Sequence, residues 1–256
     1  LVKTNKKIEL FNVPAGFDIE TSSFYIDDVK YATMYEWTFG IYGAVVIGRT
    51  WEEFVTMVTK LSEILKLHDH KRLVVYVHNL AFEFQFMRRF FVVTDGFYRD
   101  IRKPLKALLN DSIELRDSYA LSNMSLEKFC KNTPNVTHYK LVDTYDYSKL
   151  RTPETPLTEE EEAYCYNDVR GLAECIREYM QHDSLSTIPM TSTGFVRRDY
   201  RREYSKNSKL RAVFKATALD EHLYDLNKAA FRGGDTHANL KWGRQTVHHV
   251  HSFDIK

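Results

Sequence analysis

The chain has 256 residues, of which 43% are hydrophobic and 14% aromatic, so it is long enough to bury a sizeable core. Its 36 Lys and Arg against 35 Asp and Glu leave a net charge of +1, which neither indicates nor excludes a nucleic-acid partner. Three cysteines without paired spacing exclude a disulfide framework, and no apolar run reaches membrane-spanning length, so we expect reduced thiols and no membrane partner.

The hydrophobic pattern predicts strands followed by helices, the arrangement of an α/β fold. Strands are expected at 15–21, 31–39, 44–49 and 72–78. Long helices are expected from Thr50 to Leu65 and from Thr158 to Met180. Each opens with a capping box, in which Thr50 or Thr158 is followed three residues later by Glu.

The stretch SLSTIPMTSTG, 184–194, has the composition of a linker. Beyond it, residues 197–215 carry eight Lys or Arg against two acids. We therefore expect one domain over 1–187 and the beginning of a second over 188–256. The basic stretch is compatible either with contact to a DNA backbone or with a solvated helix face.

Two acids, Asp18 and Glu20, lie one residue apart at the end of an apolar run. In a strand, side chains two residues apart point to the same face, so both carboxylates project together. One interpretation is a strand end whose acids face water or pair with Lys or Arg. The other is a divalent metal site, which turns a cluster of repelling carboxylates into a set of ligands.

Two further segments place acids where a site could form. In VHNLAFEFQFM, Asn79, Phe82 and Glu83 follow the predicted buried strand, at the usual rim position of active-site groups in α/β sheets. In YCYND, Tyr164 and Asp168 are four residues apart and share a helix face. The alternatives are core phenylalanines beside a solvated Glu83, and an ordinary amphipathic helix.

In chain order, FDIET, HNLAFE and YCYND resemble the three exonuclease motifs of proofreading domains in DNA polymerases. The resemblance is closest to the protein-primed family-B DNA polymerases of small tailed phages and linear plasmids. FRGG, 231–234, resembles that family's Y-x-G-G element, and FDIK, 253–256, resembles the start of its first polymerase motif. This implies a ribonuclease-H-like 3′–5′ exonuclease domain with a mixed sheet flanked by helices, followed by the beginning of a polymerase palm.

The resemblance implies two Mg²⁺ ions, with Mn²⁺ as the alternative, and two-metal hydrolysis of a phosphodiester. The implied ligands are Asp18, Glu20, Glu83 and Asp168 in the exonuclease site, with Asp18 bridging both ions, and Asp254 in the polymerase site. Tyr164 is implied to hold the attacking water. The implied DNA-binding residues are Thr21, Asn79, Phe82, Ser118, Tyr119, Lys140, Phe231, Gly233 and Gly234.

The chain departs from the family pattern at two of these positions. Glu83 replaces the usual Asp of the second motif, and Phe231 replaces the Tyr of Y-x-G-G. The histidines His248, His249 and His251 suggest zinc, but no further ligand is suitably spaced nearby. Incidental histidines in a strand are the alternative.

The resulting hypothesis is a fragment of a viral DNA polymerase, monomeric and located in the host cytoplasm. Its complete part is expected to hydrolyse single-stranded 3′ ends, with primer–template DNA and a terminal (priming) protein as further partners. We expect no polymerisation, because Asp254 lacks the second polymerase motif. Two alternatives stay open: a free-standing exonuclease, and a catalytically silent module that binds single-stranded DNA or a protein primer.

Overall fold

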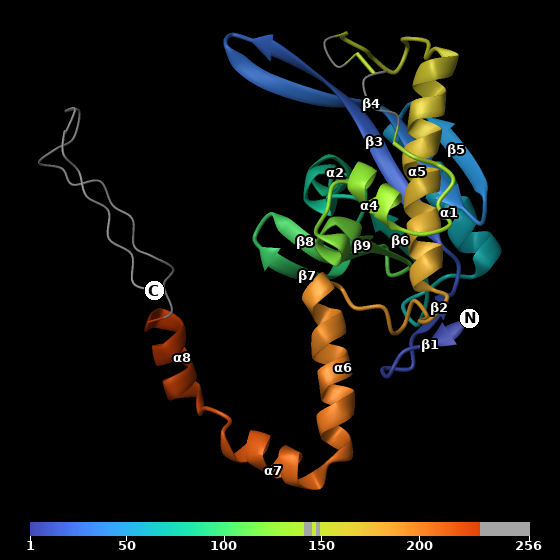
Figure 1. The fold of residues 1–256 in the computed structure, drawn as a ribbon. Coiled ribbons are helices and arrows are strands. Elements are labelled where there is room, and N and C mark those ends of the chain that lie inside the picture. Colours follow the sequence, from blue (N-terminus) through green and yellow to red (C-terminus); the bar gives the residue numbers. More distant parts are fainter. Residues whose placement is uncertain (141–144, 147–148, 231–256) are drawn as a thin grey trace, which may run out of the picture. The chain divides into compact units, whose positions relative to one another are not determined.

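The computed structural model describes residues 1–140, 145–146 and 149–230 (Figure 1). The strands of this part are β1 (Val2–Lys3), β2 (Glu9–Phe11), β3 (Ala15–Ile26), β4 (Val29–Ile41), β5 (Ala44–Gly48), β6 (Lys71–Val77), β7 (Val93–Asp100), β8 (Lys103–Leu109) and β9 (Ile113–Asp117). The helices are α1 (Trp51–Leu65), α2 (Leu80–Met87), α3 (Ser118–Ser122), α4 (Leu126–Asn132), α5 (Glu159–Tyr179), α6 (Ser192–Lys206), α7 (Ser208–Ala216) and α8 (Glu221–Ala230).

The described strands form one mixed sheet in the order β5-β4-β3-β6-β9-β8-β7. Strand β3 runs antiparallel to β4 and parallel to β6, while β2 attaches the small β1–β2 pair to β6. Helices flank the sheet (Figure 1). The predicted α/β fold with a mixed sheet flanked by helices is confirmed.

Strand β6 lies at the centre of the core and is buried on both faces. Leu73, Val75 and Val77 pack with side chains of α1 and α2, whereas Val74 and Tyr76 pack with side chains of α4 and α5. A strand covered by helices on both sides needs apolar residues at every position. This explains the continuous apolar run from which the strand was predicted.

Both predicted long helices begin at their capping boxes. The Thr50 and Thr158 hydroxyls each accept the backbone N–H of the Glu three residues on, at 3.2 Å. In return, each Glu side chain accepts the backbone N–H of its Thr. The first turn of each helix is therefore satisfied locally.

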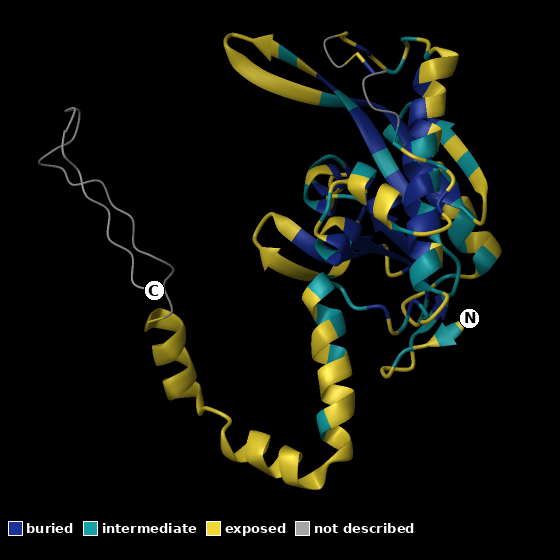
Figure 2. Ribbon diagram, in the orientation of Figure 1, coloured by how far each residue is buried: buried dark blue, intermediate teal, exposed yellow. Residues whose placement is uncertain are grey.

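The predicted strands 15–21 and 31–39 are too short, because β3 and β4 continue into a projecting hairpin. Asp27 and Asp28 form its two-residue turn and both adopt the left-handed conformation that such turns require. Near this tip the ribbon is exposed (Figure 2). No buried face imposes an alternating pattern there, so the sequence carries no strand signal.

A β-bulge interrupts β4 beside the predicted acids. Glu20 pairs with Glu36 and Thr21 with Met34, which leaves Tyr35 as an extra residue. Such bulges re-aim side chains and are over-represented next to active sites. The bulge therefore lies directly beside one of the carboxylates of the first motif.

The chain forms two compact units, one over Leu1–Tyr200 and one that begins at Arg201. Helix α6 starts at Ser192, inside the predicted linker 184–194, and no residue of α6, α7 or α8 is buried. The predicted boundary at 187/188 stays a prediction. Residues 231–256, with FRGG, the histidine cluster and Asp254, lie outside the described part. None of the described helices is both long and apolar enough to span a membrane.

Candidate active site

Three carboxylates from two elements meet on one face of the sheet. Asp18 and Glu20 project from β3, and Asp168 projects from α5, with carboxylate oxygens within 4.8 Å of one another. The same-face prediction for Asp18 and Glu20 follows from the two-residue period of the strand. Asp168 joins them because α5 covers this part of β3 and β4.

Two glycines allow α5 to approach the strands closely. A Cβ on Gly40 would lie 2.6 Å from Cγ1 of Val169, and one on Gly16 would lie 3.2 Å from its carbonyl oxygen. Real Cβ atoms rarely tolerate such distances, so larger residues would push α5 away from the sheet. Asp168, the neighbour of Val169, would then move away from the acids on β3.

The carboxyl groups of the cluster are harder to ionise than free carboxyl groups, because burial and neighbouring negative charge outweigh the effect of Lys140. Burial, together with the charge of Asp168, raises the pKa of Asp18 to about 7. Burial also raises the pKa of Glu20, and it raises that of Asp168 more than Lys140 lowers it. Among the described residues, the buried Oδ1 of Asp168 has no hydrogen-bond partner. An all-oxygen, electron-rich donor set of this kind fits a hard divalent cation such as Mg²⁺.

Glu83 lies near this group but not within it. Its side chain projects from α2 and is buried, so the alternative of a solvated Glu83 is wrong. Burial and then the charge of Asp18 raise its pKa, and Oε2 finds no partner in the part of the chain that the structure describes. Its oxygens are outside the 4.8 Å group. The role of Glu83 as a ligand stays a prediction.

Glu36 is a further buried acid next to this group, which the sequence did not reveal. It lies directly across from Glu20 on β4 and accepts a hydrogen bond from the hydroxyl of Thr38. Burial raises its pKa to about 8. No motif marks this residue, because its position depends on the register between β3 and β4.

Lys140 and Tyr164 complete the surroundings of Asp168. Lys140 donates from Nζ to Oδ2 of Asp168 at 2.6 Å and lies 4.8 Å from the ring centroid of Tyr164. Tyr164 is buried one helical turn before Asp168, and its hydrogen bond lowers the pKa of that carboxyl. The structure thus brings both predicted residues to the acidic cluster.

A hollow of about 610 Å³ lies next to Lys140, the hydrogen-bond partner of Asp168. It is lined by His78, Asn79, Tyr119, Ser125, Leu126, Glu127 and Lys140. Three of these were predicted to bind DNA: Asn79, Tyr119 and Lys140. Tyr119 and Phe82 each leave more than two fifths of their surface exposed, while Thr21 is half-buried beside Glu20 at the bulge. Exposed aromatic rings can stack on bases without reading sequence.

Asp117 is a further residue that sequence reasoning missed. Its Oδ1 accepts the backbone N–H groups of Asn79 and Tyr119 at 3.2 and 3.0 Å, so it ties the starts of α2 and α3 together. Its N-cap position before a short helix was the available signal. Ser118, predicted to bind DNA, is fully buried, and its hydroxyl donates to the carbonyl of Val77 at 3.1 Å.

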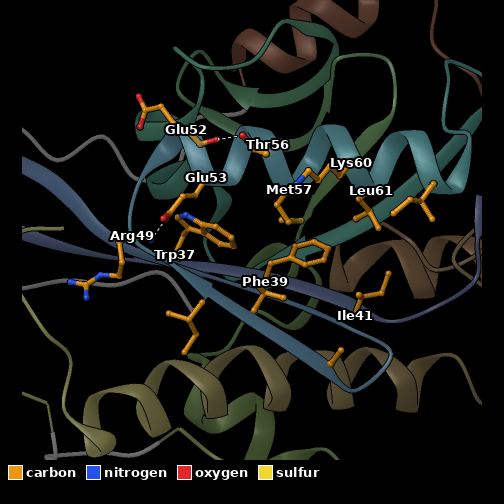
Figure 3. Close-up of a pocket in the computed structure, with 15 residues that line it drawn as sticks. Trp37, Phe39, Ile41, Arg49, Glu52, Glu53, Thr56, Met57, Lys60 and Leu61 are labelled. Atoms are coloured by element: carbon orange, nitrogen blue, oxygen red, sulfur yellow. Dashed lines mark hydrogen bonds between the residues drawn. The ribbon is translucent and has the colours of Figure 1, made fainter. Parts of the chain in front are cut away.

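A larger hollow, of about 790 Å³, lies between α1 and the strands β4 and β5 (Figure 3). Trp37, Phe39, Met57 and Leu61 are among the apolar side chains that line it. Trp37 and Phe39 alternate with Glu36 and Thr38 along β4, so they point to the opposite face of the sheet. None of the predicted site residues that the structure describes lines this hollow.

Comparisons with known proteins bear on this fold. No family model and no curated protein matches the sequence. Among solved structures, phi29 DNA polymerase with single-stranded DNA aligns at a TM-score of 0.63 and 20% identity, over 90% of this chain and 41% of that chain. Its ternary complex with primer-template DNA and incoming nucleotides aligns at 0.59 and 19%, over 91% and 41%. This fold is similar to that of phi29 DNA polymerase.

The predicted likeness to a protein-primed DNA polymerase is therefore confirmed for the fold. The chain spans about two fifths of the length of the phi29 DNA polymerase structures that it matches. Phi29 DNA polymerase is seen in these structures with single-stranded DNA and with primer-template DNA.

Proposed function

We propose that this chain is the proofreading 3′–5′ exonuclease part, with the beginning of the polymerase part, of a protein-primed DNA polymerase. The observation that carries this proposal is the meeting of Asp18, Glu20 and Asp168 in a fold similar to that of phi29 DNA polymerase. Glu20 and Asp168 are buried, Asp18 is half-buried, and the three carboxylates crowd together, an arrangement that cations relieve. The substrate is then a single-stranded DNA 3′ end.

Asp18, Glu20 and Asp168 would hold the cations, and Glu83 would add a fourth carboxylate. Bound Mg²⁺ would lower the pKa of water and neutralise charge on the scissile phosphate. Tyr164, held beside Asp168, would orient the attacking water through its hydroxyl. Lys140, whose ammonium group lies at Asp168, would contact the scissile phosphate.

The hollow next to Lys140 would hold the end of the strand. The Asn79 side chain makes no capping hydrogen bond to α2, so its amide can reach a sugar or phosphate. Phe82 and Tyr119 offer exposed rings for base stacking. Thr21 and Ser118 were implied by resemblance alone, and Ser118 would act only through its backbone or after a rearrangement. A monomer in the host cytoplasm, with a terminal protein as further partner, completes the proposal.

The direct experiment incubates the chain with a 3′-labelled single-stranded oligonucleotide and Mg²⁺ and measures release of labelled mononucleotides. We expect release that stops on addition of EDTA and in the double variant Asp18→Ala, Glu20→Ala. That variant should keep the far-UV circular dichroism of the wild type, because removing the acids relieves repulsion in the metal-free protein. Cleavage at the wild-type rate by the double variant would exclude this metal site.

The silent-module alternative predicts a different outcome in the same assay. It is favoured by one observation, that the oxygens of Glu83 lie outside the group formed by Asp18, Glu20 and Asp168. Under it, the wild type binds the labelled strand, as measured by fluorescence anisotropy, and releases no mononucleotide. A free-standing exonuclease would give the same cleavage as our proposal. It differs only in that the full-length protein would contain no polymerase domain.

A further inference from the structure

Lys140 lies on a segment that has no regular structure of its own. Residues 133–140 form neither helix nor strand, yet Lys140 reaches Asp168 at 2.6 Å. A lysine at the end of an irregular segment loses much backbone and side-chain freedom when it is held in one place. Other contacts must therefore hold this segment against α5.

Glu174 makes most of these contacts. Its Oε2 accepts the backbone N–H of Thr137 at 2.6 Å and that of His138 at 3.1 Å. Its Oε1 accepts the Thr137 hydroxyl at 3.0 Å and lies 2.8 Å from Nδ1 of His138. Although burial raises it, these hydrogen bonds lower the pKa of Glu174 to about 2, so the carboxylate stays ionised.

Gly171 provides the space in which the segment lies. A Cβ on Gly171 would be 2.5 Å from the carbonyl oxygen of His138, a backbone atom that cannot rotate away. Only glycine lets the segment lie this close to α5. His138 is two residues before Lys140, so its placement limits where the lysine can reach.

These contacts share one face of α5 with the candidate active site. Tyr164, Asp168, Gly171 and Glu174 follow one another at intervals of four, three and three residues, which is the spacing of a single helical face. Tyr164 and Asp168, nearer the start of α5, contact Lys140. Gly171 and Glu174, nearer its end, contact the backbone just before that lysine.

We propose that Glu174 and Gly171 are positioning residues, which hold the segment before Lys140 on α5 so that the lysine ammonium stays at Asp168. The proposal rests on the proposed function in one respect, that Lys140 contributes to phosphodiester cleavage. The position of Lys140 in the DNA-free protein is independent of that function and is measured separately.

The activity test compares Glu174→Ala with the matched variant Glu178→Ala. Glu178 lies one turn further along α5 and contacts the same segment, but only through the exposed side chain of Asn135, at 3.1 Å. Glu174→Ala should lower the rate at saturating single-stranded DNA by about 10- to 100-fold with KM within about twofold, because a misplaced group costs that much in a positioned reaction. Glu178→Ala should stay within about twofold of wild type.

A double variant separates positioning from general destabilisation. Adding Glu174→Ala to Lys140→Ala should cause no further loss of rate, because Glu174 acts through Lys140. A merely structural Glu174 would slow the Lys140→Ala protein as well. If Glu174→Ala does not fold, Glu174→Gln replaces it, since it keeps the side-chain volume and one acceptor oxygen.

The second readout needs no activity. Brief acetylation of the DNA-free protein, followed by mass spectrometry of peptides, reports how accessible each lysine amine is. Lys140 should react several-fold faster in the Glu174 variant than in wild type, while the exposed Lys131 on α4 reacts equally in both. A wild type that releases no mononucleotides would refute the proposed function and leave this readout decisive. Unchanged acetylation of Lys140, or an additive loss of rate, would overturn the positioning role.

Discussion

Glu83 is the residue at which this chain departs most clearly from the family that it resembles. The structure buries its side chain on α2, close enough to Asp18 for that charge to raise its pKa. A buried carboxylate oxygen without a partner among the described residues is costly unless it serves a ligand. The backbone around Glu83 must then already accommodate the extra methylene.

We therefore expect Glu83→Asp to lower mononucleotide release, although it restores the usual family residue. Shortening the side chain withdraws the carboxylate by about 1.5 Å. A displacement of that size costs about 100-fold in a positioned reaction. Rates on single-stranded DNA with Mg²⁺ test this, with Glu83→Gln as the variant that keeps the length and loses the charge. A faster Glu83→Asp protein would support the silent-module alternative.

Tyr164 gives a second prediction. Its ring packs against Tyr145 with centroids 4.5 Å apart, a contact that Phe would preserve. Tyr164→Phe should therefore lower the rate at saturating DNA by about 10-fold or more with little change in binding, because it removes the hydroxyl that would orient the water and that hydrogen-bonds Asp168. Tyr179→Phe, on the same helix, should leave both quantities unchanged. Normal cleavage by Tyr164→Phe would assign Tyr164 to core packing alone.

Helix α5 is the element that assembles the candidate site. It brings Asp168 to the acids of β3, places Tyr164 one turn earlier and carries the contacts that fix the Lys140 segment. Its distance from the sheet depends on Gly16 and Gly40. The geometry of the site is therefore sensitive to substitution of two glycines that take no part in the chemistry.

Gly40→Ala should lower the free energy of unfolding by about 1–3 kcal/mol, the usual cost of overpacking a core. The new Cβ would lie 2.6 Å from Cγ1 of Val169. Adding Val169→Ala removes that atom, so the double variant should be more stable than the sum of the single changes predicts. Urea unfolding curves measure all three proteins. Additive losses of unfolding free energy would show that Gly40 does not determine how closely α5 packs on the sheet.

Across the whole molecule, charge is balanced in number but not in place. The net charge is +1, whereas Asp18, Glu20, Glu83 and Asp168 lie near one another and Glu36 lies across from Glu20. Buried carboxylates whose pKa is raised bind more protons when folded than when unfolded. Their contribution to stability is fully present below the unfolded pKa, 3.8 for Asp18, and is lost as the pH rises through about 7.

The metal-free protein should therefore melt at a lower temperature at pH 7.5 than at pH 5. Mg²⁺ should restore the loss at pH 7.5, by at least about 3 °C, the shift that about 1 kcal/mol produces in a domain of this size. At pH 5 the same Mg²⁺ should have little effect, because protons compete for the carboxylates. Asp18→Asn should weaken both dependences. A melting temperature at pH 7.5 that ignores Mg²⁺ would contradict a metal site.

Features that depend on near neighbours in the chain were predictable from the amino-acid sequence alone. The DxE spacing placed Asp18 and Glu20 on one face of a strand, and the four-residue spacing placed Tyr164 and Asp168 on one face of a helix. Capping boxes and continuous apolar runs are equally local, so the two long helices and the buried strand β6 were predictable. Motif order then indicated the fold that the phi29 DNA polymerase structures share.

Which of these residues meet depends instead on how distant segments pack against one another. Glu36 faces Glu20 because of the register between β3 and β4 and its bulge. Asp168 lies near the acids of β3 because two glycines let α5 pack closely on the sheet. Lys140 reaches Asp168 from a segment without regular structure. Ser118 is buried rather than exposed for the same kind of reason, a contact with β6. Local spacing fixes the direction of a side chain, whereas its partner depends on packing between segments far apart in the chain, which no short pattern encodes.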